Sequence, residues 1–158
     1  MNTEHKFLAR LDGPRPDFRT VISFLWSDFH NVDSEGDSHN PASREWTSLY
    51  LQNRENGEEV VEVGRNGDEP LVLCIVSPLR SMALGVAYLL VHWSSGEILD
   101  AESGETLDQK HVMDELEVSF DLLTRIERAE RSIWNQSTLT NPYPNQKEAY
   151  QAVSGNRR

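Results

Sequence analysis

The chain begins with alternating apolar and polar positions, and the apolar residues of the next segment have the spacing of a helix. In residues 4–11, every second position from Phe7 to Leu11 is apolar, which predicts a first strand. The next apolar residues recur at the spacing of an amphipathic helix that begins at Pro16 or Asp17. One face of this predicted helix carries Phe18, Val21, Ile22, Leu25, Phe29 and Val32.

Three runs rich in β-branched and aromatic residues occupy the middle of the chain. They are WTSLYLQNR (46–54), EEVVEVGR (58–65) and PLVLCIVS (70–77). Asn56-Gly57 and Asn66-Gly67 lie between them, and Asn-Gly tolerates the positive φ values of a type I′ turn. The pattern predicts a three-stranded antiparallel meander.

Two helices and a short strand are predicted after the meander. Residues 77–96 indicate a helix with Ser77 as N-cap and Pro78 in its first turn, although 86–93 is also compatible with a strand. The stretch EILDAESGE, starting at residue 97, indicates a short strand and a turn. Residues 106–135 predict one long helix, with Thr106 and Gln109 in capping-box register.

The order of these elements is typical of the α+β class. It predicts a mainly antiparallel sheet, in the order strand, helix, three-strand meander, helix and strand, with helices packed on it and a long C-terminal helix. The chain has 158 residues, the size of one domain. We expect a single domain over 1–134 and a polar, mobile tail over 135–158, which offers few apolar groups for burial.

The net charge of −11 is concentrated in the middle of the chain. Residues 33–69 hold ten acids and three bases, and residues 70–109 hold five acids and one base. Solubility alone could explain such an excess. It disfavours nucleic-acid binding, which needs a basic face, and it favours a protein partner with a basic surface.

The acid-rich meander is the candidate binding surface. A two-residue turn at Asn56-Gly57 would pair Glu55 with Glu58 and crowd acids at the hairpin tip. Trp46 and Tyr50 share one face of the predicted strand and could anchor a partner, or could instead face the core beneath a helix. The candidate partner-binding residues are Asp33, Glu35, Asp37, Trp46, Tyr50, Glu55, Glu58, Glu59 and Glu62.

The stretch HNVDSEGDSHN (30–40) raises the question of a metal site. A calcium-binding EF-hand loop that starts at Asp33 is excluded. Ser38 occupies the position where such a loop needs glycine, and Arg44 occupies the position of the bidentate glutamate. Zinc binding by His30 and His39 with Asp33 or Asp37 would have no specific spacing signature. The residue types suit a polar loop, so we expect neither a metal nor another cofactor.

No catalytic motif is recognisable in the sequence. A nucleophile elbow and a phosphate-binding glycine loop are both absent, and Cys74 lies in the middle of a predicted strand. His92 suits a structural place near a helix end, and Asp100 suits a turn. We therefore predict no catalytic residues. The N-terminus does not resemble a signal peptide and no apolar run is long enough to span a membrane, so we expect a cytoplasmic protein.

In architecture and charge, the chain resembles the small acidic immunity proteins that bacteria make against toxins of contact-dependent and polymorphic systems. The resemblance is carried by the double Asn-Gly meander, by the buried helix that leads through SSG into EILDAESGE, and by the absence of catalytic motifs over 1–134. It implies that the protein masks a cognate toxin by one-to-one binding in the cytoplasm. The alternatives are an acidic secretion chaperone for an effector protein, and an unrecognised small hydrolase or metal-dependent enzyme.

Overall fold

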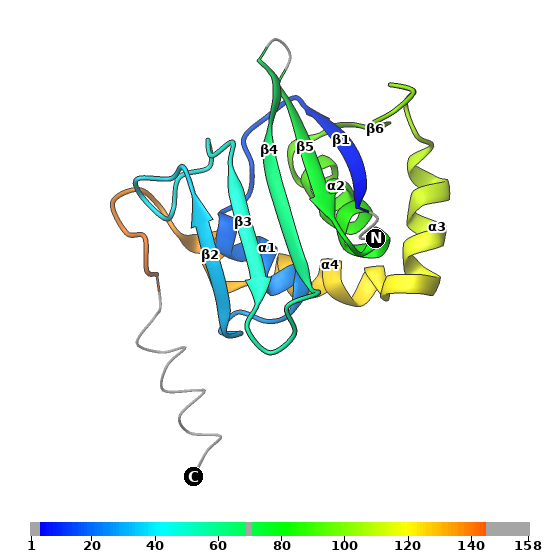
Figure 1. Cartoon of the computed structure of the whole chain (residues 1–158). Coiled ribbons are helices and arrows are strands. Elements are labelled where there is room, and N and C mark those ends of the chain that lie inside the picture. The colour runs from blue at the N-terminus through cyan, green and yellow to red at the C-terminus, as the bar shows by residue number, and fades with distance from the viewer. Residues whose placement is uncertain (1–3, 69–70, 145–158) are drawn as a thin grey trace.

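Six antiparallel strands form one sheet in the order β2-β3-β4-β5-β1-β6 (Figure 1). The computed structural model describes residues 4–68 and 71–144. The strands are β1 (His5–Leu11), β2 (Val32–Gly36), β3 (Leu49–Asn53), β4 (Val60–Asp68), β5 (Leu71–Ser77) and β6 (Gly96–Asp100). The helices are α1 (Phe18–Leu25), α2 (Arg80–Ser94), α3 (Gln109–Phe120) and α4 (Leu122–Glu130), followed by the short 3₁₀ helix η1 (Ile133–Gln136). The predicted α+β class with a mainly antiparallel sheet is confirmed.

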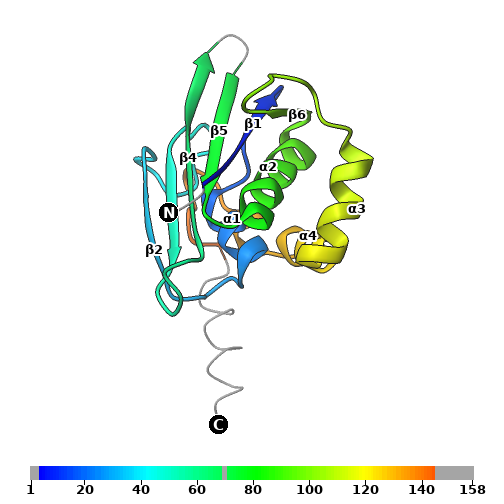
Figure 2. The same ribbon diagram turned by 45° about the vertical axis from the view of Figure 1, so that its right-hand side comes forward.

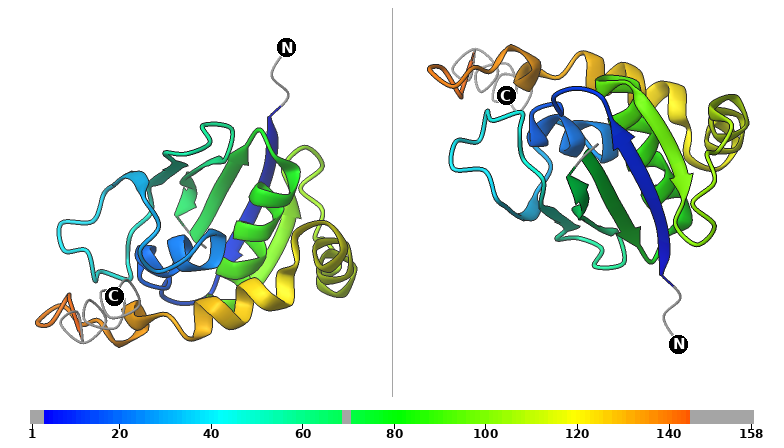
Figure 3. Two further views of the ribbon diagram at one scale, coloured as in Figure 1. Left: turned by 90° about the horizontal axis from the view of Figure 1, so that it is seen from below. Right: turned by 90° about the horizontal axis from the view of Figure 1, so that it is seen from above.

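All four helices lie on the same side of the sheet (Figure 2). Helices α1 and α2 lie next to the strands, while α3 contacts α2 and α4 contacts α1 from outside, as the views along the sheet show (Figure 3). This position explains why α2 is apolar on nearly every side, because strands cover one side and helices the other. Residues 86–93 are helical, and none of the helices in the described part of the chain lies on the opposite face of the sheet.

Helix α1 is shorter than the apolar pattern predicted. Asp17 caps its start, as expected, but the helix ends at Leu25 instead of continuing to Val32. The side chains of Arg125 and Arg128 reach from α4 and donate hydrogen bonds to the last carbonyls of α1, including that of Phe24. These tertiary contacts satisfy the last carbonyl groups of α1, so the helix can end here.

The composition of the stretch 30–40 predicted a polar loop, but part of this stretch forms a strand. Val32–Gly36 forms β2, an edge strand that pairs with β3 in antiparallel register. Polar residues suit this position, because a strand at the edge exposes most of its surface to water. Pairing with β3 therefore determined the structure of a segment that has no β-rich signature of its own.

The three-stranded meander β3-β4-β5 is confirmed, but its two turns differ from the prediction. The β3–β4 pairing ends at Gln52 and Val60, so the connection is longer than a two-residue turn, and Gly57 does not have positive φ. Glu55 and Glu58 are therefore not a cross-strand pair. The second Asn-Gly lies inside β4, where a bulge shifts the register between Arg65 and Gly67.

The predicted long final helix is two helices. Asp121 separates α3 from α4 in the left-handed conformation, with φ of 55°. Asp108, rather than Thr106, caps α3 by accepting a hydrogen bond from the Lys110 N–H group. Thr106 instead forms an isolated β-bridge with Leu99.

Residues 135–144 pack against the domain, which differs from the mobile tail expected from their composition. The Ser137 hydroxyl donates to Asp17 over 2.6 Å, and Arg19 donates to the Pro142 carbonyl over 2.7 Å. Polar side chains at the start of α1 hold this segment, and the ring of Tyr143 also contacts that of Trp134. Residues 145–158 lie outside the described part of the chain. Among the described residues, no helix has the length and apolar character needed to cross a membrane.

Candidate protein-binding surface

The face of the sheet opposite the helices, here called the open face, is the candidate functional surface. Strand alternation sends one set of side chains into the core and the other set outward. The outward set includes an apolar strip of partly exposed side chains in the centre of the sheet. The members of this apolar strip are Leu8, Val60, Val72, Cys74 and Val76.

Two glutamates flank a tyrosine on the open face. The strand register places Tyr50 of β3 opposite Glu35 of β2 on one side and opposite Glu62 of β4 on the other. Glu62 in turn lies opposite Val76, a member of the apolar strip. In the described part of the chain, neither glutamate forms an ion pair.

A shallow groove follows this part of the open face. It has a volume of about 880 Å³, and Glu35, Tyr50, Glu62 and Val76 are among its lining residues. The Tyr50 hydroxyl donates a hydrogen bond to Gln52 over 3.0 Å, which holds the ring along the strand. The groove thus combines a fixed aromatic ring, apolar side chains and carboxylates with one arginine, Arg65, which is a surface suited to a protein partner.

The remaining exposed acids lie around the groove but not in one cluster. Asp33 of β2 forms an ion pair with Arg54 over 2.7 Å, and both side chains are about half exposed. Glu55 and Glu58 are exposed in the β3–β4 connection, beyond the end of the paired strands. Of the candidate residues, the structure brings together Glu35, Tyr50 and Glu62 in one row.

Trp46 cannot be an exposed anchor, because its side chain is only 2% exposed. Strand β3 begins at Leu49, so the alternation that was used to place Trp46 beside Tyr50 does not reach it. Its indole N–H donates to the Pro16 carbonyl over 2.8 Å, and its own carbonyl accepts from Arg15. Trp46 is a core residue that ties the segment before β3 to the start of α1.

Asp37 also has a structural role rather than a free carboxylate. It accepts hydrogen bonds from the Thr47 hydroxyl and from the N–H groups of Thr47 and Ser48. Partial burial acts to raise the pKa of Asp37, but these hydrogen bonds outweigh it and hold the pKa below the ordinary value. Asp37 therefore closes the loop between β2 and β3.

Glu59 links the segment between β3 and β4 to the end of α1. Its carboxylate accepts hydrogen bonds from Asn53 over 2.8 Å and from the Trp26 indole over 2.7 Å. These two bonds, the one from Asn53 first, hold the pKa of Glu59 below its ordinary value. We conclude that Glu59 is a positioning residue of the fold and is not available for an incoming partner.

We expect Glu59→Gln to lower the free energy of unfolding by about 1 kcal/mol at neutral pH, because a charged acceptor is replaced by a neutral one. A carboxyl group whose pKa is lowered by folding stabilises the fold above its ordinary pKa, and this stability is lost as the pH falls through the folded pKa. The difference between wild type and variant should therefore shrink below the ordinary value of 4.5. Urea unfolding across this pH range measures it.

Glu58→Gln is the control, because Glu58 is exposed and only its backbone N–H is hydrogen-bonded, to Asn56. It should unfold like wild type at neutral pH. A Glu59→Gln variant with unchanged stability at neutral pH would contradict the structural role of Glu59.

The three side chains considered for catalysis occupy separate places. Cys74 lies on the open face in β5, and burial raises the pKa of its thiol. His92 lies in α2, where its ring stacks with Tyr88 and contacts Glu130 at 3.2 Å. Backbone N–H groups of Ser103 and Glu102 hold the pKa of Asp100 below its ordinary value, because they donate to its carboxylate in the turn after β6.

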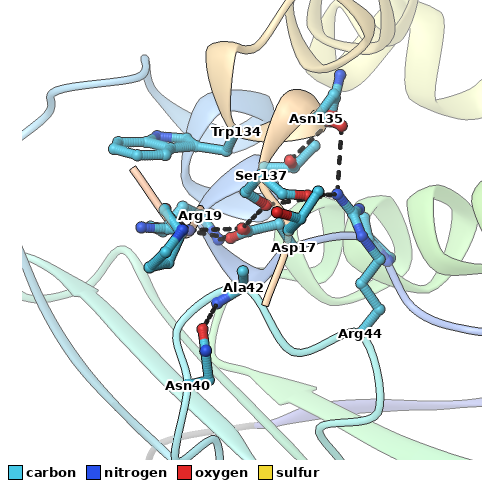
Figure 4. Close-up of polar contacts among 12 residues, drawn as sticks. Asp17, Arg19, Asn40, Ala42, Arg44, Trp134, Asn135 and Ser137 are labelled. Carbon is cyan, nitrogen blue, oxygen red and sulfur yellow. Dashed lines mark hydrogen bonds and ion pairs between the residues drawn. The ribbon is translucent and has the colours of Figure 1, made fainter. Parts of the chain in front are cut away.

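A buried polar network beneath the start of α1 was missed by the sequence reasoning (Figure 4). Asp17 is fully buried and accepts two hydrogen bonds from the guanidinium of Arg19, at 2.9 and 2.7 Å. The guanidinium also lies 4.1 Å from the ring centre of Trp134. Asp17 thus joins the start of α1, Arg19 and Ser137, which gives this network a structural role.

The apolar strip was also missed as part of the surface, although the sequence contains its signal. The even-numbered positions of β5, Val72, Cys74 and Val76, alternate with the core residues Leu73 and Ile75. This run is apolar on both faces, which is typical of a strand covered on both sides. The helices of residues 4–68 and 71–144 cover only one side of the sheet, so the second apolar row indicates a surface that a partner can cover.

No group of three or more metal-ligating side chains that could hold an ion occurs among the described residues. Comparison with protein families, curated proteins and solved structures gave no match.

Proposed function

We propose that this protein is a non-catalytic binding protein whose open face engages a partner with a basic surface. The observation that carries the proposal is the row Glu35, Tyr50, Glu62 beside the apolar strip. An aromatic side chain surrounded by partly exposed apolar groups provides a hot spot, and unpaired carboxylates at its border attract a basic partner.

The separate positions of the candidate catalytic residues support a non-catalytic role. No hydrogen bond joins Cys74, His92 or Asp100 to one another in the described part of the chain, and His92 and Asp100 interact with neighbouring structural groups. The resemblance in architecture and charge to immunity proteins suggests inhibition as the biological role. We propose that the partner is a bacterial toxin with a basic active-site cleft, which the acidic open face blocks in the cytoplasm.

The test compares two double charge reversals of equal size. Glu35→Lys with Glu62→Lys alters the open face, whereas Glu102→Lys with Glu105→Lys alters exposed positions in the turn after β6. A partner captured by the wild-type protein from the cells that make it should be retained by the second variant and lost by the first. With the purified partner, the first variant should associate about tenfold more slowly at low salt, with a smaller difference at high salt.

Tyr50→Ala tests the aromatic anchor in the same assay. Loss of a hot-spot side chain costs about 2 kcal/mol, which corresponds to roughly thirtyfold faster dissociation. A partner that binds equally to wild type and to the Glu35/Glu62 variant would contradict the proposal. So would a catalytic turnover that is abolished by one substitution at Cys74, His92 or Asp100.

A further inference from the structure

The two edges of the sheet differ in whether their backbone is already paired. At the β6 edge, Leu107 N–H donates to the Ile98 carbonyl over 2.8 Å, and Asp100 N–H donates to the Glu105 carbonyl over 2.9 Å. The returning chain also bridges Leu99 to Thr106. The outward groups of β6 are thus largely satisfied within the chain.

At the β2 edge, the backbone groups that point away from β3 can be identified from the flanking hydrogen bonds. Arg54 N–H donates to the Asn31 carbonyl, and Asp37 N–H donates to the Ser48 carbonyl. In an antiparallel ladder, hydrogen-bonded positions alternate, so Asp33 and Glu35 bond to β3. The N–H and C=O groups of Val32, Ser34 and Gly36 therefore point outward, and no backbone partner for them occurs in the described residues.

A small pocket lies beside this edge on the helix side of β2. It has a volume of about 110 Å³, and its lining includes Phe18, Trp46, Ser34 and Gly36. Ser34 has a small side chain and Gly36 has none, so the pocket stays open beside the edge, where Phe18 is partly exposed and Trp46 is buried behind it. The pocket also contains the Ser38 hydroxyl, which is buried without a hydrogen-bond partner among the described residues.

On the other side of β2, the side chains that border an incoming strand are acidic. Asp33 and Glu35 both point to the open face, where Glu35 faces Tyr50. A second copy of this chain is a poor occupant for the edge. Antiparallel pairing of two β2 strands centred on Ser34 would place Asp33 of each copy directly opposite Glu35 of the other, and like charges in such pairs are destabilising.

We propose that the partner protein adds a strand to the free edge of β2. This proposal rests on the proposed function and specifies how the partner binds. The added strand carries lysine or arginine at the positions beside Asp33 and Glu35. It carries apolar residues at the intervening positions, one of which enters the pocket lined by Phe18 and Trp46. Main-chain hydrogen bonds to Val32, Ser34 and Gly36 provide the affinity, and the alternating side chains provide the specificity.

The probe is a short synthetic peptide in which lysine and valine alternate, titrated into isotope-labelled protein. Its binding should slow hydrogen exchange at the amides of Val32, Ser34 and Gly36. The same peptide with glutamate in place of lysine should bind much more weakly. N-methylation of the peptide nitrogens that face β2 should weaken binding about tenfold or more, because donors are lost while side chains are kept.

Ser34→Pro provides the matching change in the protein. Proline removes the outward N–H of Ser34 without removing a hydrogen bond to β3, and proline is tolerated at sheet edges for this reason. It should weaken peptide binding about tenfold, whereas Ser34→Ala, which keeps the N–H, should bind like wild type. If Ser34→Pro fails to fold, the N-methylated peptide gives the same test on the wild-type protein.

Two outcomes overturn strand addition. One is peptide binding that alters only Tyr50 and Glu62 and leaves the β2 amides unprotected, which would leave the proposed function of the open face intact. The other is no binding, or equal binding of the lysine and glutamate peptides. The proposed function itself fails separately, if partner capture is insensitive to charge reversal at Glu35 and Glu62.

Discussion

Asp17→Ala should lower the free energy of unfolding by about 4 kcal/mol, since it leaves a buried guanidinium without its counter-charge. Asp17 is fully buried, and Arg19 is only 7% exposed. The substitution removes both hydrogen bonds from the guanidinium, the cap of α1 and the bond from Ser137. Arg19 then stays in a protein interior that no longer compensates its charge.

Asp108→Ala is the matched control. Asp108 also caps a helix, through a hydrogen bond from the N–H group two residues later, but it is exposed. Its loss should cost about 1 kcal/mol, which is typical of an N-cap. Urea unfolding of the two variants therefore separates the buried network from the cap, and equal losses would show that the Asp17–Arg19 pair adds nothing beyond capping.

Gly96→Ala should lower the free energy of unfolding by more than about 3 kcal/mol, or prevent folding, because strain and a clash act together. Gly96 has φ of 134°, and a Cβ atom at this position would lie 1.9 Å from the Arg10 carbonyl oxygen. The obstacle is backbone of the central strand β1, opposite which Gly96 begins β6. Relief would require β6 to move away from β1.

Gly104→Ala is the control that measures the cost of a positive φ without a steric clash. Gly104 also has positive φ, of 74°, but nothing lies within 4 Å of the added Cβ atom. It should cost only about 1 to 2 kcal/mol, the usual penalty for an ordinary residue in the left-handed region. Thermal or urea unfolding tests the pair, and a Gly96→Ala protein as stable as Gly104→Ala would contradict the close packing of β6 on β1.

The structure also changes which acids are expected to meet a partner. Glu35 and Glu62 stay as candidates because their positions in the strands put them on the open face, and Tyr50 lies between them. Asp37 and Glu59 leave the candidate set, because hydrogen bonds within the fold occupy their carboxylates. A count of charges in a sequence cannot distinguish these two groups, since the distinction depends on which donors the fold brings near.

The elements that the sequence determined are those in which local pattern and burial agree. Alternation in β1, and the β-branched and aromatic content of the runs that form β3, β4 and β5, predicted strands whose inward residues lie in the core. Nearly uniform apolarity predicted α2 as a deeply buried helix. In each case the side chains of the element itself carry enough apolar surface to require burial in one conformation.

The tertiary structure alone decided where several elements end and which face stays open. Arginines from α4 satisfy the end of α1, Asp121 turns the final helix into two, and β3 makes a strand of the polar segment Val32–Gly36. Trp46 lies inside because β3 starts after it. These outcomes depend on partners distant in sequence, and hydrogen bonds between such partners leave no periodic signal in the segments that they join.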